Sequence, residues 1–439
     1  MKPPLRLTAE TLAALRATLA PSTQAHLENA IAAIVAARQR GVRVVVVTGS
    51  GPNLHEGVTT QIAELIHHGL VDGVITSSAV IAHEMAGTLD RVKRVRIEPG
   101  DEESLPAELL PRGAVFEITE LSAQQRAALE IELPHGWDLY DRMAARRGNS
   151  VIKAAGNMAW PMGLRTERLA QELGSAASQY GVPLELMAGL GASPHTMIGA
   201  GARKGVPVLV SIPQLVGGGG VGIAIGDSIP IARRSRAIAD MLSTADVIIE
   251  SAIALTQEIH DGPFETYTGH GIWAAWDHMK TYSLKNKTLI RIDLDPNLER
   301  AWERERQGSE VQDAINRGLP KTKLTGIPFR MEMSGFARLE GSIPITADIG
   351  VAWPVLVSAL EERLGLRLDF ISAPQESDQG KQMRAWIADE VSAVDREASY
   401  AEARRTLTPH RHDCPVSELH NLKKHCHPER SEVSAVVLE

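Results

Sequence analysis

The densest group of side chains able to do acid–base chemistry lies in "TQEIHDGPFETYTGHGIWAAWDHMKTY", residues 256–282. It follows the apolar run "DVIIES" and contains Glu258, His260, Asp261 and His270. A histidine near a carboxylate can accept and return a proton, and a polar, aromatic loop after a buried strand is typical of a binding pocket. We predict these four residues as catalytic. The alternative is that the tryptophans of this stretch only pack a helix.

A second candidate site follows the four valines of "VVVVTGSGPNLHEGV". A strand that leads through a loop into a helix directs backbone N–H groups and the positive end of the helix dipole toward an anion such as a pyrophosphate. We predict Asn53, Leu54 and His55 as cofactor-binding residues. The glycine spacing does not match G-x-G-x-x-G, so a plain strand-to-helix turn is the alternative.

Polar side chains also follow the next apolar run, "VDGVITSS". Ligands of open α/β sheets lie at the carboxyl ends of strands, so two neighbouring strand ends with polar loops support each other. We predict Thr76, Ser77, Ser78 and Glu84 as further cofactor-binding residues. The two serines are also suited to cap a helix.

Two more strand ends carry candidate cofactor contacts. In "LVGGGGVG", Gly218 and Gly219 let the backbone approach a ligand closely, although four glycines also make a flexible hinge. In "LIRIDLDP", Asp293 is placed to accept hydrogen bonds from ribose hydroxyls, or to take part in a turn before Pro296.

The cysteines and most clustered histidines lie near the C-terminus. Cys414 and Cys426 are the only cysteines, so no disulfide joins the body of the chain, which is typical of a reducing cytoplasm. The spacing of the terminal His and Cys residues matches no zinc pattern, and we predict no metal site.

The elements that would position these residues alternate between short apolar runs and amphipathic helices. This alternation predicts a doubly wound, mostly parallel α/β sheet with helices on both faces, after two leading helices. The predicted strands are 42–49, 71–78, 91–100, 113–119, 184–193, 206–215, 246–252 and 287–295.

The same pattern divides the chain into regions. We predict a helical N-terminal extension (1–40), an α/β NAD-binding-type domain (41–372) with two possible lobes (41–150 and 151–372), a C-terminal helical segment (373–405) and a disordered tail (406–439).

Composition excludes some partners. The 439 residues are 44% hydrophobic and carry a formal charge of -8, and no basic block would follow a phosphate backbone, so we expect no nucleic-acid partner. The longest weakly polar run, 206–225, contains prolines and a glycine cluster, so we expect no membrane helix.

The segment "PNLHEGVTTQIAELIHHGLVDGVITSSAVIAHEM" resembles the first nucleotide-binding unit of deoxyhypusine synthases. The resemblance resumes at "SPHTMIGAGARKGVPVLVSIPQL" and at "IARRSRAIADMLSTADVIIESAIALTQEIHDG". The NAD-binding domain of ornithine cyclodeaminase and LOR/SDH-like proteins is similar over the same pieces. The resemblance implies NAD as cofactor, a small amine or amino acid as substrate, and a homo-oligomer (dimer or tetramer) with sites near subunit interfaces.

One departure changes the expected reaction. Thr256 stands where the resemblance places the imine-forming lysine of the synthases, and a hydroxyl cannot form an imine. We therefore expect an NAD-binding enzyme that does not make deoxyhypusine. A deaminase similar to ornithine cyclodeaminase and a non-catalytic ligand-binding or structural member of the fold are the alternatives.

Overall fold

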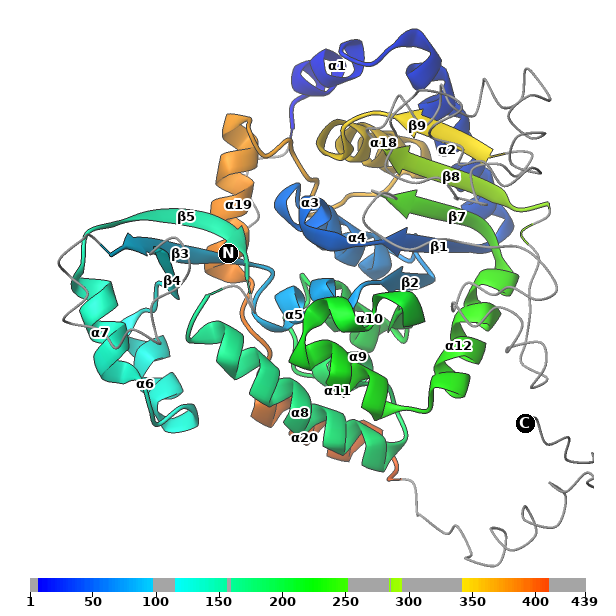
Figure 1. The fold of residues 1–439 in the computed structure, drawn as a ribbon. Coiled ribbons are helices and arrows are strands. Elements are labelled where there is room, and N and C mark those ends of the chain that lie inside the picture. The colour runs from blue at the N-terminus through cyan, green and yellow to red at the C-terminus, as the bar shows by residue number, and fades with distance from the viewer. Residues whose placement is uncertain are drawn as a thin grey trace, which may run out of the picture.

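A six-stranded parallel sheet forms the centre of the protein (Figure 1). The structure, a computed structural model, describes residues 7–97, 115–155, 159–251, 284, 286–293 and 342–409. The strand order is β6-β2-β1-β7-β8-β9, and every neighbouring pair is parallel. The strands are β1 (Arg43–Thr48), β2 (Gly73–Thr76), β6 (Val208–Val210), β7 (Ala245–Ser251), β8 (Thr288–Asp293) and β9 (Ser342–Thr346).

The valine run explains why this sheet is covered on both faces. Val44 and Val46 pack into one hydrophobic cluster, whereas Val45 and Val47 pack into another on the opposite face. Continuous apolar strands of this kind are typical of parallel sheets. On the first face lie α2 (Pro21–Arg40), α4 (Val58–His67) and α18 (Ile349–Leu364), and on the second lies α12 (Ile231–Thr244). The predicted doubly wound α/β class is confirmed.

The strand order reverses between β1 and β7. The chain passes from β1 through β2 to β6 at one edge, and then returns through α12 to place β7 on the other side of β1. Because all six strands are parallel, their carboxyl ends meet at the same edge of the sheet. The topological switch point therefore lies at the carboxyl ends of the paired strands β1 and β7, and open α/β sheets bind ligands at such a point.

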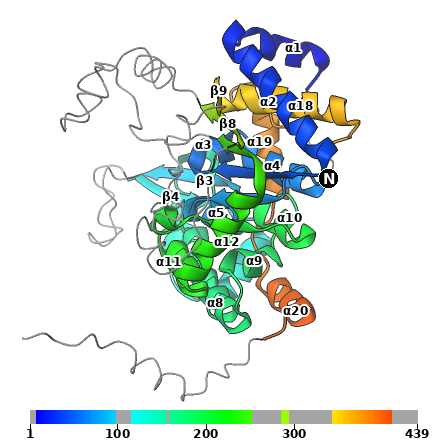
Figure 2. The ribbon, with the colours of Figure 1, turned by 90° about the vertical axis from the view of Figure 1, so that its right-hand side faces the viewer.

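Several helices surround this edge and the β6 side of the sheet (Figures 1 and 2). They are α3 (Ser50–His55), α5 (Ser78–Met85), α8 (Met162–Tyr180), α9 (Leu184–Gly189), α10 (Met197–Lys204), α11 (Gly220–Ser228), α19 (Asp378–Glu390), α20 (Arg396–Thr406) and the 3₁₀ turns η4 (Ile212–Gln214) and η5 (Val216–Gly218). Helix α1 (Ala9–Ala17) lies on the opposite side, against α18. None of the helices in the described ranges combines the length and apolar character needed to cross a membrane.

A separate antiparallel sheet forms a small lobe with α6 (Ala123–Glu132) and α7 (Trp137–Ala145) (Figure 1). Its order is β4-β3-β5, made by β3 (Leu89–Arg96), β4 (Val115–Thr119) and β5 (Gly148–Ala154). The prediction that 91–100 belongs to the parallel sheet is therefore wrong, whereas the strand predicted at 113–119 is confirmed as β4. Among the charged residues of β3, Arg94 and Arg96 are exposed, as a half-exposed antiparallel sheet allows.

The predicted strand at 184–193 is also wrong, because this segment begins with helix α9. Leu184, Met187 and Ala188 are good helix formers and are buried in the core. Glu185 turns toward β6, where its Oε1 accepts a hydrogen bond of 2.8 Å from the backbone N–H of Val210. The segment thus covers the sheet edge instead of joining it.

Candidate functional site

A chain of buried hydrogen bonds closes the switch point between β1 and β7. Ser251, the last residue of β7, donates 2.7 Å to Asn53 Oδ1. The Asn53 amide donates 2.5 Å to the Gly49 carbonyl, and Trp353 Nε1 donates 2.9 Å to the Ser251 hydroxyl. These contacts join the loop after β1 to the end of β7 and to α18.

This arrangement gives the predicted Asn-Leu loop a structural role. Both polar atoms of the Asn53 side chain are engaged within the protein, and Leu54 is fully buried in the core. Asn53 therefore holds the loop in place, and because Gly49 is buried, Gly51 is the glycine of this loop whose backbone is left for a ligand. A Cβ added at Gly51 would meet only the edge of His55, at 4.0 Å, so there is space above this backbone.

A second junction joins two of the other predicted segments. The Ser78 hydroxyl donates 2.7 Å to the Gln214 carbonyl and accepts 2.8 Å from the Gly218 N–H. A Cβ at Gly218 would lie 2.7 Å from the Ser78 backbone, so this close approach requires glycine. Gly219 has φ 60° and ψ −132°, a conformation open almost only to glycine. The glycine run is therefore a packed connection between two strand ends.

The remaining residues of the second strand end have distinct surroundings. The Thr76 hydroxyl is buried and, like that of Thr48 at the end of β1, has no hydrogen-bond partner in the described part of the chain. Ser77 caps α5, because its hydroxyl accepts a 3.3 Å bond from Val80 N–H. Glu84 lies at the far end of α5, where it accepts bonds from the first two N–H groups of α10.

His55 faces a group of cationic side chains. Arg384 of α19 donates 3.2 Å to its Nδ1, which leaves the proton of the neutral ring on Nε2. Burial, together with the positive charges of Arg384, His83 and Lys153, lowers the pKa of His55 to about 4. Arg384 therefore places a positive charge beside His55, which suits an anion, whereas Lys153 is already ion-paired to Glu117 at 2.7 Å.

The predicted catalytic residues fall outside the described part of the chain. These are Glu258, His260, Asp261 and His270, which follow Ser251 in the sequence. Asp293 is the last residue of β8 and is in register with Thr346 of β9. Its side chain is not among the parts of the chain that the structure describes.

The switch point includes residues that the sequence reasoning missed. Ser251 and Trp353 are separated from Asn53 by 198 and 300 positions, so no local motif connects them. Arg384 lies in α19, whose charged residues are spaced as in any solvent-exposed helix, so the sequence does not single it out. Glu250 and Arg291 are also buried, in register on neighbouring strands, and their side chains leave the same face of the sheet. For Glu250 and Arg291, the sequence did offer a signal, because each is a charged residue within an otherwise apolar strand.

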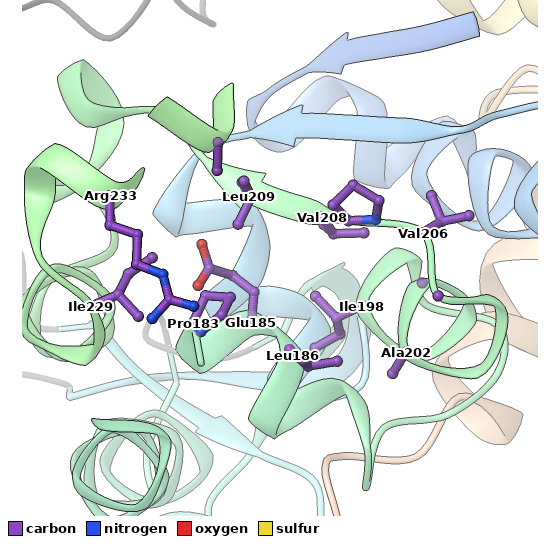
Figure 3. Close-up of a pocket in the computed structure, with 14 residues that line it drawn as sticks. Pro183, Glu185, Leu186, Ile198, Ala202, Val206, Val208, Leu209, Ile229 and Arg233 are labelled. Atoms are coloured by element: carbon purple, nitrogen blue, oxygen red, sulfur yellow. The ribbon is translucent and has the colours of Figure 1, made fainter. Parts of the chain in front are cut away.

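A cavity of about 310 Å³ lies at the outer edge of β6, away from the switch point (Figure 3). Its wall is mostly aliphatic, from Leu186, Ile198, Val208 and Leu209, with Arg233 at one end. The Glu185 carboxylate at this edge is fully buried and ion-paired to Arg234 at 2.5 Å. None of the predicted site residues in the described ranges lines this cavity.

The residues at the switch point fit the phosphates of a dinucleotide. Gly51 is half-exposed with open space above it, α3 has no side-chain cap, and Arg384 lies beside His55. The unpartnered Thr48 and Thr76 hydroxyls add polar groups at the two strand ends. In contrast, the N-terminus of α11 is covered by the Glu167 carboxylate, which would repel an anion.

Comparison with known proteins identifies distant structural neighbours. No protein-family model matches the chain, and no curated protein matches it. A putative deoxyhypusine synthase from Entamoeba histolytica aligns at a TM-score of 0.39 and 10% identity, over 83% of this chain and 96% of that one. AgrE, in a ternary complex with ornithine and NAD+, aligns at 0.36 and 13%, over 82% and 34%. A putative LOR/SDH protein from Methanococcus maripaludis S2 aligns at 0.34 and 12%, over 82% and 70%.

The chain spans about a third of the length of AgrE (34%) and of the cyanobacterial arginine dihydrolase ArgZ (32%). The neighbours thus include proteins named for deoxyhypusine synthase and for LOR/SDH, the two resemblances noted in the sequence. At these TM-scores they carry no argument about activity, and the fold class rests on the topology of the chain itself.

Proposed function

We propose that the protein is an NAD-binding enzyme that acts on a small amine or amino acid. The observation that carries the proposal is the switch point, where the Gly49–Gly51 loop is anchored through Asn53 to Ser251. Open α/β sheets bind nucleotides in this position. The dinucleotide phosphates would lie over the loop backbone.

Charge supports this placement. Arg384 lies beside His55, and its positive charge would attract the pyrophosphate. His55 is neutral at pH 7, so its Nε2–H is available as a hydrogen-bond donor without adding a further charge.

The proposed catalytic groups enter from the neighbouring strand. NAD, when bound, would accept a hydride from the substrate carbon that bears the amine. The chain leaves β7 at Ser251, at the switch point, and continues into the segment that contains His260, Asp261 and His270. We propose His260 or His270 as the group that moves the amine proton, with Glu258 and Asp261 available to hold the ammonium.

Two further features of the proposal rest on the sequence, the first on the resemblance and the second on cysteine content. A homo-oligomer, dimeric or tetrameric, would place these sites near subunit interfaces. Cytoplasmic localisation follows the absence of cysteine from the first 413 residues.

Calorimetric titration of the full chain with NAD+ tests the proposal. We expect saturable binding, and no heat or tryptophan-fluorescence change at millimolar NAD+ would reject it. Incubation with NAD+ and a panel of amino acids and diamines, with NADH and ammonia assayed in parallel, then separates the two enzymatic readings. Release of ammonia would favour the deaminase alternative over group transfer, and binding without turnover would favour the non-catalytic one.

A further inference from the structure

The cavity at the outer edge of β6 is framed by a buried ion pair (Figure 3). The Glu185 carboxylate of α9 accepts hydrogen bonds from Arg234 of α12, at 2.5 Å and 3.2 Å, and from the Val210 N–H of β6, at 2.8 Å. Both side chains of the pair are fully buried, and their charges neutralise each other. These contacts fix α9, α12 and β6 against one another, so the cavity of about 310 Å³ beside them is pre-formed.

The wall of this cavity is apolar where a ligand would meet it. Pro183, Leu186, Val206 and Ala237 line it and are half-buried, and Pro207 is exposed. Proteins are close-packed, and apolar atoms around an empty space lose the contacts that a filled space would give them. An apolar cavity that a rigid frame keeps from collapsing is typical of a site for a small ligand.

Arg233 brings a positive charge to one end of the cavity. Its side chain is exposed and reaches from α12 toward Pro183, where Nη1 donates 2.6 Å to the Gly181 carbonyl (Figure 3). That bond holds the guanidinium in place, while its Nε and Nη2 groups make no hydrogen bond to the residues that the structure describes. Nε and Nη2 together form the fork that matches the two oxygens of a carboxylate.

The charges of the cavity favour an anion. Glu185 and Arg233 are the charged residues that line it in the described ranges, and Glu185 is already neutralised by Arg234. Arg233 therefore leaves the cavity with a net positive charge at one end and an apolar wall along the rest. This arrangement is complementary to a molecule with one carboxylate and an apolar tail.

The volume limits the length of that tail. A water molecule takes up about 30 Å³ in the liquid, so a cavity of 310 Å³ holds roughly ten non-hydrogen atoms. Octanoate is a carboxylate of this size.

We propose that this cavity binds an apolar monocarboxylate of medium chain length. Its carboxylate accepts hydrogen bonds from Arg233 Nε and Nη2, and its chain lies against Leu186, Val206 and Ala237. No residue of the described part of the switch point lines the cavity, so binding requires no NAD and the proposal is independent of the proposed function.

Calorimetry of the full chain without NAD+ tests the proposal on a series of carboxylates. Butanoate, hexanoate and octanoate should bind with increasing affinity, by roughly four- to tenfold for each two methylenes, because more of the chain leaves water. The gain should end near octanoate, where the cavity is full, so dodecanoate should bind at most about twofold tighter. A steady increase through dodecanoate, or no binding of octanoate at millimolar concentration, would overturn the proposal.

A variant of Arg233 separates the charge from the apolar contact. Octan-1-ol, which has the same chain without the carboxylate, should bind the wild type about fivefold or more weakly than octanoate. Arg233→Gln should lose about fivefold or more in affinity for octanoate and keep its affinity for octan-1-ol, because only the carboxylate meets the guanidinium. Arg236→Gln, at an exposed arginine of α12 that does not line the cavity, is the matched control and should bind octanoate as the wild type does. Equal affinities of the two variants for octanoate would contradict the carboxylate contact.

A variant of the wall tests the apolar contact. Ala237→Leu adds carbon atoms where the chain should lie, so it should weaken octanoate and octan-1-ol alike, by about fourfold or more, in a protein whose thermal unfolding shows that it folds. Unchanged affinities in this folded variant would place the ligand elsewhere.

A second copy of the chain is the other occupant that an apolar cavity at a sheet edge could take. Sedimentation of the wild type with and without octanoate distinguishes the two, and we expect the same molecular mass in both. Dissociation of an assembly by octanoate would assign the cavity to a subunit interface and overturn the proposal.

Discussion

The Ser251 hydroxyl donates a 2.7 Å hydrogen bond to Asn53 Oδ1, and this contact joins the end of β7 to the loop after β1. It crosses the point at which the strand order reverses, so it fixes the position of the Gly49–Gly51 backbone against the sheet. Asn53, which is predicted to bind the cofactor, also positions the loop over which we propose that the cofactor lies.

Replacing Ser251 with alanine should destabilise the fold. Asn53 Oδ1 and Trp353 Nε1 would both lose their partner in a buried site, at a cost of about 2–3 kcal/mol in the free energy of unfolding. Urea unfolding measures this. Ser243→Ala, which removes a half-buried hydroxyl bonded only to the Asp240 carbonyl, should cost clearly less. Equal costs for the two variants would contradict the role given to Ser251.

The glycine run offers a sharp pair of substitutions. Gly218→Ala would place a Cβ 2.7 Å from the Ser78 backbone, and this overpacking should cost about 1–3 kcal/mol in the free energy of unfolding. Gly217→Ala would meet only Ser78 Oγ at 3.9 Å and should be neutral or slightly stabilising. Thermal or urea unfolding of the two variants compares them, and similar stabilities would argue for a loose hinge.

Glu84 predicts a pH dependence of stability. Burial raises its pKa to about 7 in the folded protein, against two backbone hydrogen bonds that lower it. Between the unfolded pKa near 4.5 and the folded value, the folded state binds more protons, so the contribution of Glu84 to stability falls as the pH rises through this window.

Urea unfolding at pH 5 and pH 7 measures that contribution. The loss of stability between these values should be smaller in Glu84→Gln than in the wild type, because the amide does not titrate there. Glu10→Gln, in the first turn of α1, is the control and should keep the wild-type difference. An unchanged difference in Glu84→Gln would mean that another group dominates.

Local patterns predicted much of the fold but little of the site geometry. The run Val44–Val47 indicates a buried parallel strand because both faces must be apolar, and the structure confirms it. The charged residues of β3 indicate a half-exposed strand, whereas its apolar residues alone do not distinguish it from a strand of the buried parallel sheet. The contact of Ser251 with Asn53 joins positions 198 residues apart, so spacing along the chain cannot reveal it.

The predicted helix cap at Ser77 and the glycine loop show where sequence reasoning stopped. Capping by Ser77 is a local property and is observed. The need for glycine at 218 depends on the approach of Ser78, which is 140 residues away, so the sequence could not distinguish a packed turn from a hinge.

The most direct measurement of the central claim is the dissociation constant for NAD+ of Gly51→Asp compared with Gly51→Asn. Both side chains point into open space on the first turn of α3, and φ at this position is not in the left-handed region, so both variants should fold. A carboxylate there would repel the cofactor phosphates, whereas the amide is nearly the same size and neutral. We predict that Gly51→Asp binds NAD+ at least about tenfold more weakly than Gly51→Asn, which should bind nearly as the wild type does. Equal affinities in the two variants would contradict a dinucleotide site at the switch point.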